Sequence, residues 1–163
     1  MTVRQIREFG DPVLREVCLA IKALSAAEGL VKDLEETCAL PGRAGVAANQ
    51  IGVALRAFSY SADGVAGYLI NPELVELSGE PTPVAEGCLS LPGLWFDTPR
   101  YPVAVVRGQL LDGRTVQMRC EGLLAQVMQH ECDHLDGKLF IDRLDQDSRK
   151  QALRQLRSQR PSN

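Results

Sequence analysis

The sequence predicts an α+β fold with antiparallel β-sheets, and three observations support this prediction. Strand-like segments follow one another through the middle of the chain and are joined by short turns, while helix-like segments are set apart from them. This order differs from the strand–helix alternation of a doubly wound parallel sheet. The 163 residues are 45% hydrophobic and 24% charged, so we expect one globular domain over residues 1–163.

The helix-like segments carry start signals and amphipathic patterns. Asp11 precedes Pro12, which is typical of an N-cap followed by the first helical position. Residues 25–40 predict an amphipathic helix, and residues 146–157 predict a charged helix near the end of the chain. In the first of these helices the apolar face consists of Leu30, Val31, Leu34 and Cys38.

Strand-like patterns occupy the middle of the chain and are interrupted by Pro, Gly and turn residues. The stretch "PGRAGVAANQIG" at 41–52 is rich in small residues and predicts a loop. An Asp-Gly-Arg turn at 112–114 separates two strand-like runs and predicts a hairpin. The expected strands are 53–60, 67–70, parts of 71–93, 103–111 and 115–120.

The bulk properties exclude several classes of protein. The net charge of −3 gives no general attraction to nucleic acid, and no apolar run approaches the roughly 18 residues of a membrane span. The first residues lack the apolar core of a secretory signal. The five cysteines are odd in number and irregularly spaced, so we expect reduced thiols and a cytoplasmic location.

Both histidines of the chain lie four positions apart in a segment, residues 123–135, that predicts a buried helix. Residues i and i+4 share a helix face, so His130 and His134 point the same way and can hold one metal ion. Glu131 stands beside the first of them, as in the H-E-x-x-H helix of zinc hydrolases, where this glutamate is the general acid/base. Cys132 is about 200° around the helix from the first histidine and is expected to face elsewhere.

Two imidazoles are too few for a catalytic zinc-type site, which usually has three protein ligands and a water. Burying Asp133 and the H-E-x-x-H residues in an apolar helix is costly, and a metal would account for that cost. Cys88 lies in a glycine-containing turn that can present its sulfur inward, although spacing alone does not select it over Cys120. The alternatives left open are a metallopeptidase with a downstream carboxylate ligand, Asp142 or Asp145, and a non-catalytic site with structural histidines or a structural metal.

Three short motifs resemble those of the peptide deformylases and occur in that family's order. They read "GVAANQ" at 45–50, "EGCLS" at 86–90 and "QHECDHLDG" at 129–137. The opening "GDPVLRE" at 10–16 is similar to the family as well, and the resemblance extends from about residue 5 to residue 145. Three motifs in order are a specific signal, whereas each alone would be weak.

The resemblance implies a role for each motif. Glu131 would be the catalytic acid/base, and the side chain of Gln50 and the backbone N–H of Leu89 would hold a developing oxyanion. Without the resemblance, the favoured interpretation of Gln50 is a loop amide that caps nearby backbone. The metal ligands that the resemblance implies are Cys88, His130 and His134.

The resemblance also implies a reaction and a cofactor. Peptide deformylases remove the formyl group from the N-terminal formylmethionine of new polypeptides and release formate. Their single divalent ion is commonly Fe²⁺, and Zn²⁺, Ni²⁺ or Co²⁺ can occupy the same ligands. The architecture implied is a set of antiparallel sheets packed around a central metal-binding helix, with a C-terminal helix.

Two segments are expected to bind the substrate. In "GVAANQ" the small residues let a peptide main chain approach closely, and the strand edge at Gly45 and Val46 can pair with it. Counting back along the helix by three and seven positions from the first histidine reaches Val127 and Leu123, which can line a pocket for the methionine side chain, with Gln126 at its rim. Plain core packing is the alternative for these helix residues.

Two positions depart from the pattern of the family that the motifs resemble. Arg43 stands where the first motif usually begins with glycine, which puts substrate pairing at this loop in question. Trp95 stands near the position at which many relatives carry an arginine that meets the substrate. We therefore expect altered specificity or inhibitor response at the Trp95 loop.

The segment 145–163 predicts a basic C-terminal helix and tail. Nascent chains emerge from a particle rich in RNA, so this helix could dock on the ribosome, with a solvated helix end as the alternative. The basic residues at helical spacing are Lys150, Arg154 and Arg157.

Overall fold

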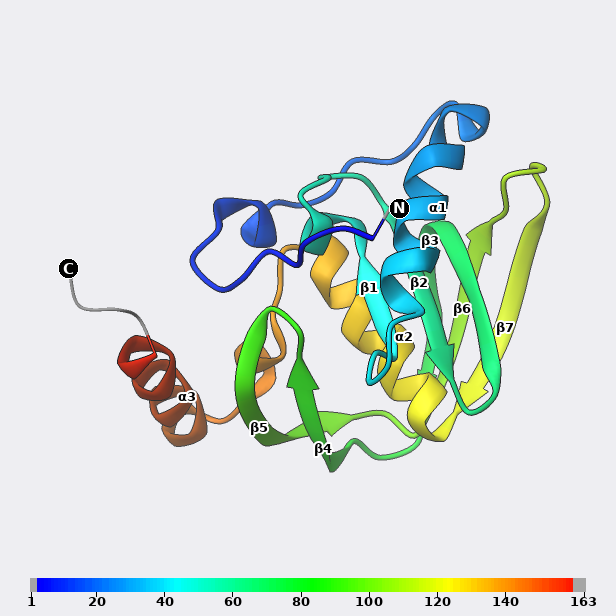
Figure 1. Cartoon of the computed structure of the whole chain (residues 1–163). Helices are drawn as coiled ribbons and strands as arrows, with labels where there is room; N and C mark the ends of the chain where they lie inside the picture. The colour runs from blue at the N-terminus through cyan, green and yellow to red at the C-terminus, as the bar shows by residue number, and fades with distance from the viewer. Residues whose placement is uncertain (1–2, 160–163) are drawn as a thin grey trace.

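The computed structural model describes residues 3–159 and has an α+β fold (Figure 1). Its strands are β1 (Gly45–Ala47), β2 (Ala57–Ala62), β3 (Val65–Ser78), β4 (Thr82–Cys88), β5 (Leu91–Arg100), β6 (Val103–Gln109) and β7 (Thr115–Glu121). Its α-helices are α1 (Glu28–Cys38), α2 (Gly122–Leu135) and α3 (Gln146–Ser158). Short 3-10 turns at Pro12–Arg15, Leu24–Ala27, Ala48–Ile51 and Phe140–Arg143 complete the described elements.

The strands form two antiparallel sheets, as the sequence predicts. The larger sheet has the order β1-β2-β3-β6-β7, and every neighbouring pair in it is antiparallel. The smaller sheet is the β4–β5 hairpin. Because β1 lies at an edge of the larger sheet, it presents one row of main-chain groups outside the sheet pairing.

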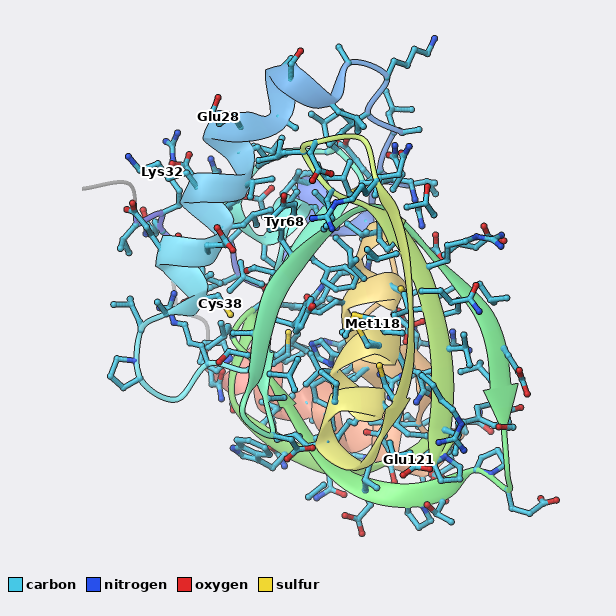
Figure 2. The ribbon with its side chains drawn as sticks, turned by 90° about the vertical axis from the view of Figure 1, so that its right-hand side faces the viewer. Glu28, Lys32, Cys38, Tyr68, Met118 and Glu121 are labelled. Carbon is cyan, nitrogen blue, oxygen red and sulfur yellow. The ribbon has the colours of Figure 1, made fainter. Side chains whose placement is uncertain are left out.

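The larger sheet separates two layers of hydrophobic core, because successive side chains on a strand face opposite sides of a sheet. The residues that pack on the α2 side are Ala47, Phe58 and Leu69, and their chain neighbours on the α1 side are Val46, Ala57 and Ile70. Figure 2 shows α2 inside the curve of the sheet and α1 outside it. The alternation of the strands therefore fixes both helices against one sheet.

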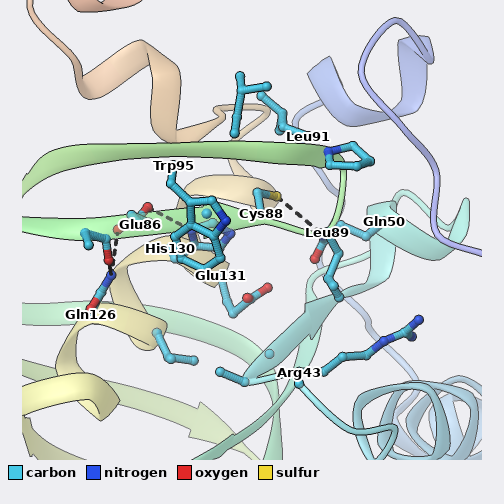
Figure 3. Close-up of a pocket in the computed structure, with 18 of the residues that line it drawn as sticks. Arg43, Gln50, Glu86, Cys88, Leu89, Leu91, Trp95, Gln126, His130 and Glu131 are labelled. Carbon is cyan, nitrogen blue, oxygen red and sulfur yellow. Dashed lines mark hydrogen bonds and ion pairs between the residues drawn. The ribbon is translucent and has the colours of Figure 1, made fainter. Parts of the chain in front are cut away.

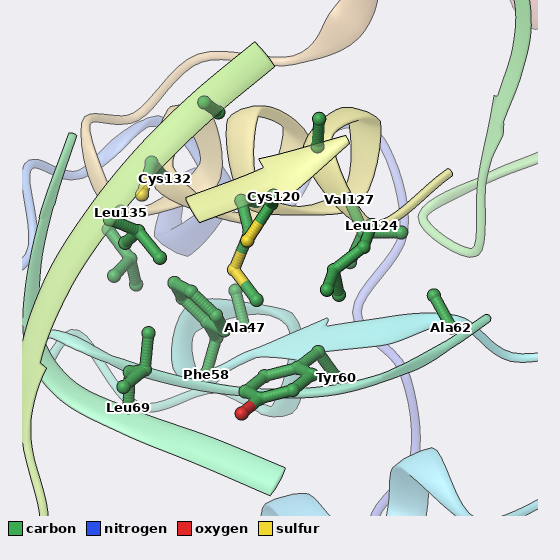
Figure 4. Packing of buried hydrophobic residues seen from close by; sticks show 14 of the residues in the cluster. Ala47, Phe58, Tyr60, Ala62, Leu69, Cys120, Leu124, Val127, Cys132 and Leu135 are labelled. Atoms are coloured by element: carbon green, nitrogen blue, oxygen red, sulfur yellow. The ribbon is translucent and has the colours of Figure 1, made fainter. Parts of the chain in front are cut away.

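α2 is the central helix of the molecule. Its apolar face packs against aromatic and aliphatic side chains of the sheet (Figure 4), and Ala125, Met128 and Leu135 in it are fully buried. Burying one large aliphatic side chain contributes roughly 1.5–3 kcal/mol to the stability of the fold. Several such side chains on one face therefore fix the orientation of the helix about its axis. The opposite face of α2, which carries both histidines, is thereby turned toward the β4–β5 hairpin.

The C-terminal part of the chain packs on this hairpin. Leu91 and Leu94 of β5 belong to a third core cluster with residues of the Phe140–Arg143 turn and of α3. α3 begins at Gln146 and is capped by Asp145, whose side chain accepts a hydrogen bond from the Ser148 N–H at 2.8 Å. The predicted C-terminal helix is confirmed, and the part of the predicted tail at 160–163 lies outside the described residues.

Some predicted boundaries are wrong. The expected loop at 41–52 contains β1 and a 3-10 turn, and its alanines Ala47 and Ala48 are fully buried. The expected strand at 53–60 begins only at residue 57, because Leu55 instead forms an isolated parallel bridge with Leu19. The last part of β5 was not predicted, since its Asp and Pro residues are typical of turns.

The helix predictions hold with small changes in their bounds. The helix expected at 25–40 is α1, and a 3-10 turn precedes it. The predicted cap at Asp11 is confirmed, because its side chain accepts from the Val13 N–H at 3.1 Å, although the element that follows is a single 3-10 turn. Within residues 3–159, no helix has both the length and the hydropathy needed to cross a membrane.

Candidate metal centre

His130 and His134 lie one turn apart on the polar face of α2, as their spacing predicts. Their Nε2 atoms are 3.2 Å apart, and their ring centroids are 4.8 Å apart. The side chain of His134 is buried, and its Nδ1 atom has no hydrogen-bond partner in the described part of the chain. Two imidazole nitrogens that face each other at this distance need a shared proton or a cation between them.

Cys88 joins the two histidines from the end of β4. The β4–β5 pairing is irregular between Glu86 and Cys88, and such a bulge re-aims the side chain that follows it. The sulfur lies 3.3 Å from His134 Nε2, and the three potential ligand atoms lie within 4.8 Å of one another. Tetrahedral sites with metal–nitrogen distances of about 2.0–2.1 Å and metal–sulfur distances of about 2.3 Å keep their ligand atoms roughly 3.3–3.6 Å apart. The separations of 3.2 Å between the two Nε2 atoms and 3.3 Å between the sulfur and His134 Nε2 are close to these values, and the group of three could hold one metal ion.

The other four cysteines lie in the hydrophobic core. Burial raises the pKa of Cys18 to about 11, and it also raises the pKa values of Cys38, Cys120 and Cys132. These thiols stay protonated at neutral pH and are poor metal ligands. The fold thus decides between Cys88 and Cys120, which spacing alone had not separated, and the prediction that Cys132 faces away from the histidines is confirmed.

Glu131 lies beside the cluster and lines a cavity in front of it. The carboxyl group is buried, and its Oε2 atom has no hydrogen-bond partner among residues 3–159. Burial raises the pKa of this carboxyl to about 7. Gly45 leaves the space that Glu131 occupies, because a Cβ atom at position 45 would lie 2.5 Å from Glu131 Oε1. A glycine is thus needed here for the glutamate itself, in addition to any role toward a peptide.

The side chain of Gln50 is fixed at both ends of its amide. Its Oε1 accepts from the Ala47 N–H at 2.9 Å, which is the backbone-capping role considered from the sequence. Its Nε2 donates to Ser90 Oγ at 3.1 Å and points to Cys88 Sγ at 3.7 Å. Figure 3 shows Gln50 beside Cys88 and Leu89 at one end of the cavity. The amide donor is therefore held in place next to the three-residue cluster.

The cavity has a volume of about 370 Å³. Of the predicted substrate-binding residues, Gly45, Leu123 and Val127 line it, and Gln126 and Leu89 do so as well. The side chain of Val46 is fully buried in the core on the α1 side, so only its main chain can face a ligand at the β1 edge.

Both departures from the expected motif pattern lie at this cavity. Trp95 is 71% exposed, and its ring covers Gly87, where an added Cβ would approach the ring to 3.0 Å (Figure 3). Arg43 lines the other side, and its Nη1 donates to the carbonyl of Thr37 at 2.9 Å. Arg43 is therefore tied to the C-terminal end of α1, whereas Trp95 offers an exposed aromatic face.

A buried network of charges behind His130 was not predicted. Arg100 is 4% exposed, makes a two-pronged ion pair with Glu86 and donates to Asp133 Oδ2 at 2.8 Å. Arg143 donates to the other oxygen of Asp133 at 2.7 Å. Burial alone would raise the pKa of Glu86, but its hydrogen bonds to Arg100 and His130 outweigh this effect and hold the pKa at about 2.

The network corrects one expectation drawn from the sequence. A metal was expected to account for the burial of Asp133, but Arg100 and Arg143 neutralise this carboxylate instead. Glu86 could have been identified from the sequence as a site residue, because it is the first residue of the motif that contains Cys88. No feature of the sequence identified Arg100 as a site residue. It lies in the unpredicted part of β5, and its partners Glu86 and Asp133 are 14 and 33 residues away.

The two downstream carboxylates have other partners. Asp142 accepts from the Leu139 N–H at 2.8 Å and forms an ion pair with Arg15. Asp145 caps α3. Neither belongs to the cluster of Cys88 with the two histidines, so a metallopeptidase with one of them as third ligand is not favoured.

Two imidazoles and a thiol beside a buried carboxylate, at a cavity large enough for a small ligand, are typical of metal-dependent hydrolases. A family model described as Polypeptide deformylase matches residues 3–150. The chain belongs to the polypeptide deformylase family and is an enzyme of that family. Its α+β fold and its metal-binding group agree with this membership.

Individual relatives agree with the family assignment. A peptide deformylase of Acidothermus cellulolyticus is 49% identical over 158 residues, which are 96% of this chain and 87% of the relative. The crystal structure of peptide deformylase from Thermus thermophilus has a TM-score of 0.88 at 37% identity, covering 96% of this chain and 94% of that one. A peptide deformylase from Synechococcus elongatus, solved in complex with actinonin, has a TM-score of 0.87 at 28% identity and covers 99% and 92% of the two chains.

Gly45→Ala is predicted to lower the rate of deformylation by roughly 10²-fold. The new methyl group would displace the Glu131 carboxylate, and a displacement of about 1 Å of a reacting group can reduce the rate by this factor. Metal content, measured by elemental analysis, should stay at the parent level. Gly29→Ala is the matched control, since nothing lies within 4 Å of a Cβ built at that position in α1. Equal activity of Gly45→Ala and the parent would contradict the packing described for Glu131.

Proposed function

We propose that this chain removes the formyl group from the N-terminal formylmethionine of nascent polypeptides and releases formate. The observation that carries the proposal is the convergence of Cys88, His130 and His134 beside a cavity that Glu131 also lines. These atoms come from two elements that are distant in sequence, in a chain that belongs to the polypeptide deformylase family. The cytoplasm, where polypeptides are made, is the compartment that this function requires.

The three residues of the cluster would hold one divalent cation, and we assign Fe²⁺ as its working identity. The same nitrogen and sulfur donors also suit Zn²⁺, Ni²⁺ and Co²⁺. When bound, the cation supplies a water of lowered pKa and a positive charge for the formyl oxygen. Two neutral imidazoles and one thiolate leave a net charge of about +1 at such a site, so proton transfer by the protein carries more of the reaction.

Glu131 would move the proton. Its carboxylate accepts the proton of the attacking water and passes it to the departing nitrogen of the formamide. A group whose pKa is about 7 suits both steps, because it takes up and releases a proton with little cost near neutral pH. Its buried position beside the cavity, next to Gly45, supports this role.

Gln50 and Leu89 would stabilise the oxygen that becomes anionic when the formyl carbon turns tetrahedral. The Gln50 Nε2 group is held by its contacts to Ser90 and Cys88, and it would exchange one of them for the oxyanion. Leu89 lies next to Cys88 at the cavity, so its N–H can serve as the second donor. Removal of one such donor typically costs about 10²–10³ in rate.

The cavity and the β1 edge would bind the peptide. The main chain of Gly45 and Val46 lies at the free edge of the larger sheet, where an extended peptide can add as a further strand. Leu123 and Val127 give the cavity an apolar wall for the methionine side chain. This arrangement recognises the first side chain and the main chain of the peptide. An enzyme that acts on many nascent proteins requires this kind of recognition.

α3 would contribute contact with the ribosome. Ala152 and Leu156 bury one face of this helix, and the basic side chains on the outer face are exposed: Lys150, Arg154 and Arg157. A basic helix face binds phosphate backbone through charge, so the contact should weaken as salt rises.

Cys88→Ser is predicted to lower bound metal to below a tenth of the parent level and to abolish formate release from formyl-Met-Ala-Ser, because a hydroxyl replaces the thiolate ligand. Purification and assay without oxygen, with elemental analysis of the same samples, measure both effects. Cys120→Ala, in the core and outside the cluster, is the control for thiol loss. Full metal retention in Cys88→Ser would favour a carboxylate ligand and a different hydrolase.

Glu131→Gln is predicted to reduce kcat by roughly 10²–10⁴-fold, because the amide cannot take up the proton. Metal content and KM should change little, since the amide keeps the size of the carboxylate. Parallel measurement of formate release and metal content separates proton transfer from metal loss. A kcat within threefold of the parent value would exclude Glu131 as the proton carrier.

The triple variant Lys150→Glu, Arg154→Glu and Arg157→Glu is predicted to bind ribosomes more weakly at low salt, while its activity on a short formyl peptide stays at the parent level. Cosedimentation at several salt concentrations measures the effect. Arg114→Glu with Arg119→Glu, exposed and on the β6–β7 hairpin, is the control for a general loss of positive charge. Cosedimentation that is absent in the parent or insensitive to salt would exclude docking through α3.

A further inference from the structure

We infer that Glu86 is a positioning residue that fixes His130 in the tautomer and orientation needed to bind the cation through Nε2. This inference rests on the proposed function, because it concerns the same metal site. The contact that motivates it is the 2.8 Å distance between His130 Nδ1 and Glu86 Oε2. Figure 3 shows this contact on the side of the imidazole that faces away from Cys88.

The carboxylate of Glu86 is held by hydrogen bonds on both oxygens. Oε1 accepts from Arg100 Nε at 2.9 Å and from Gln126 Nε2 at 3.3 Å. Oε2 accepts from Arg100 Nη2 at 2.6 Å and faces His130 at 2.8 Å. The side chain is 2% exposed, so these protein groups replace the water that a carboxylate would otherwise bind. Its position is therefore determined before any metal arrives.

An ionised carboxylate accepts hydrogen bonds and donates none. His130 must therefore donate through Nδ1, which leaves the lone pair of Nε2 free in the neutral ring. The His130 Nε2 atom lies 3.2 Å from His134 Nε2, inside the cluster with Cys88. The contact with Glu86 thus selects the tautomer in which the nitrogen nearest the cluster is the ligand atom.

The two histidines are not equivalent in this respect. Nδ1 of His134 has no hydrogen-bond partner among residues 3–159, whereas Nδ1 of His130 faces a carboxylate. His134 gains its orientation from complete burial in α2. His130 is more exposed, and the hydrogen bond supplies the constraint that packing does not.

The charges of the ion network behind His130 balance one another. Glu86 and Asp133 carry two negative charges, and Arg100 and Arg143 carry two positive charges. Replacing Glu86 by glutamine removes one negative charge and leaves Asp133 as the remaining carboxylate partner of the Arg100 guanidinium. Both the weaker hydrogen bond, which is no longer to a charged acceptor, and the excess positive charge of the network would disfavour a cation at His130.

The test compares Glu86→Gln with the parent as Zn²⁺-loaded full-length proteins. Competition with a chelator should give a Zn²⁺ dissociation constant 10- to 100-fold higher for Glu86→Gln, the range that partners of metal ligands typically contribute. Asp133→Asn is the matched control, because Asp133 belongs to the same ion network but does not touch His130. We expect this control to lose thermal stability while its Zn²⁺ affinity stays within about threefold of the parent.

A second measurement needs only the parent protein. The chain contains two histidines, so its imidazole nitrogen NMR spectrum has two sets of signals to assign. In the parent protein we expect a hydrogen-bonded proton on His130 Nδ1. This readout stays informative if Glu86→Gln fails to fold.

Four outcomes decide between the proposals. Equal Zn²⁺ affinity of Glu86→Gln and the parent, or a His130 bound to Zn²⁺ through Nδ1, would overturn the positioning role and leave the deformylase proposal standing. Equal losses of affinity in Glu86→Gln and Asp133→Asn would overturn it too, because the network would then act only on stability. A parent protein that binds Zn²⁺ with the expected asymmetry but releases no formate would refute the proposed function alone.

Discussion

The packing of α2 on both of its faces is the constraint on which the rest of the site depends. One face supplies apolar side chains to the core of the larger sheet, and this burial fixes how the helix is rotated about its axis. The other face then has to place His130, Asp133 and His134 toward the β4–β5 hairpin. Burying polar groups is costly unless they find partners, and the hairpin supplies the partners of His130 and Asp133.

Arg100 is the main partner that the hairpin supplies. It bonds Glu86 within the hairpin and Asp133 on α2, and so ties the two elements together through buried ion pairs. Desolvating these charges is expensive, and breaking one member of such a buried pair typically costs about 3–5 kcal/mol. β4 of this hairpin ends at Cys88, so the network that holds the hairpin also holds the sulfur near the two imidazoles.

On the cavity side of the site, the main chain of residues 45–50 lies close to the side chains of the metal centre. Gly45 lets β1 pass next to Glu131, and Gln50 in the following 3-10 turn bonds both the Ala47 backbone and the Ser90 side chain. The motif at residues 45–50 therefore has two roles: Gly45 leaves space for the Glu131 carboxylate, and Gln50 places an amide donor next to the Cys88 thiol. This explains why small residues that predict a loop form a buried strand and turn instead.

The sequence by itself determined the features that depend on local geometry. Four residues make one helical turn, so the shared face of His130 and His134, and the opposite direction of Cys132, followed from spacing. The β6–β7 hairpin and the cap at Asp11 are equally local. Only the tertiary structure decided that Cys88 rather than Cys120 meets the histidines, and that Arg100 neutralises Asp133. These contacts join residues 33 and 46 positions apart, and the energy that selects them comes from burying α2 between two sheets, which no short stretch of sequence contains.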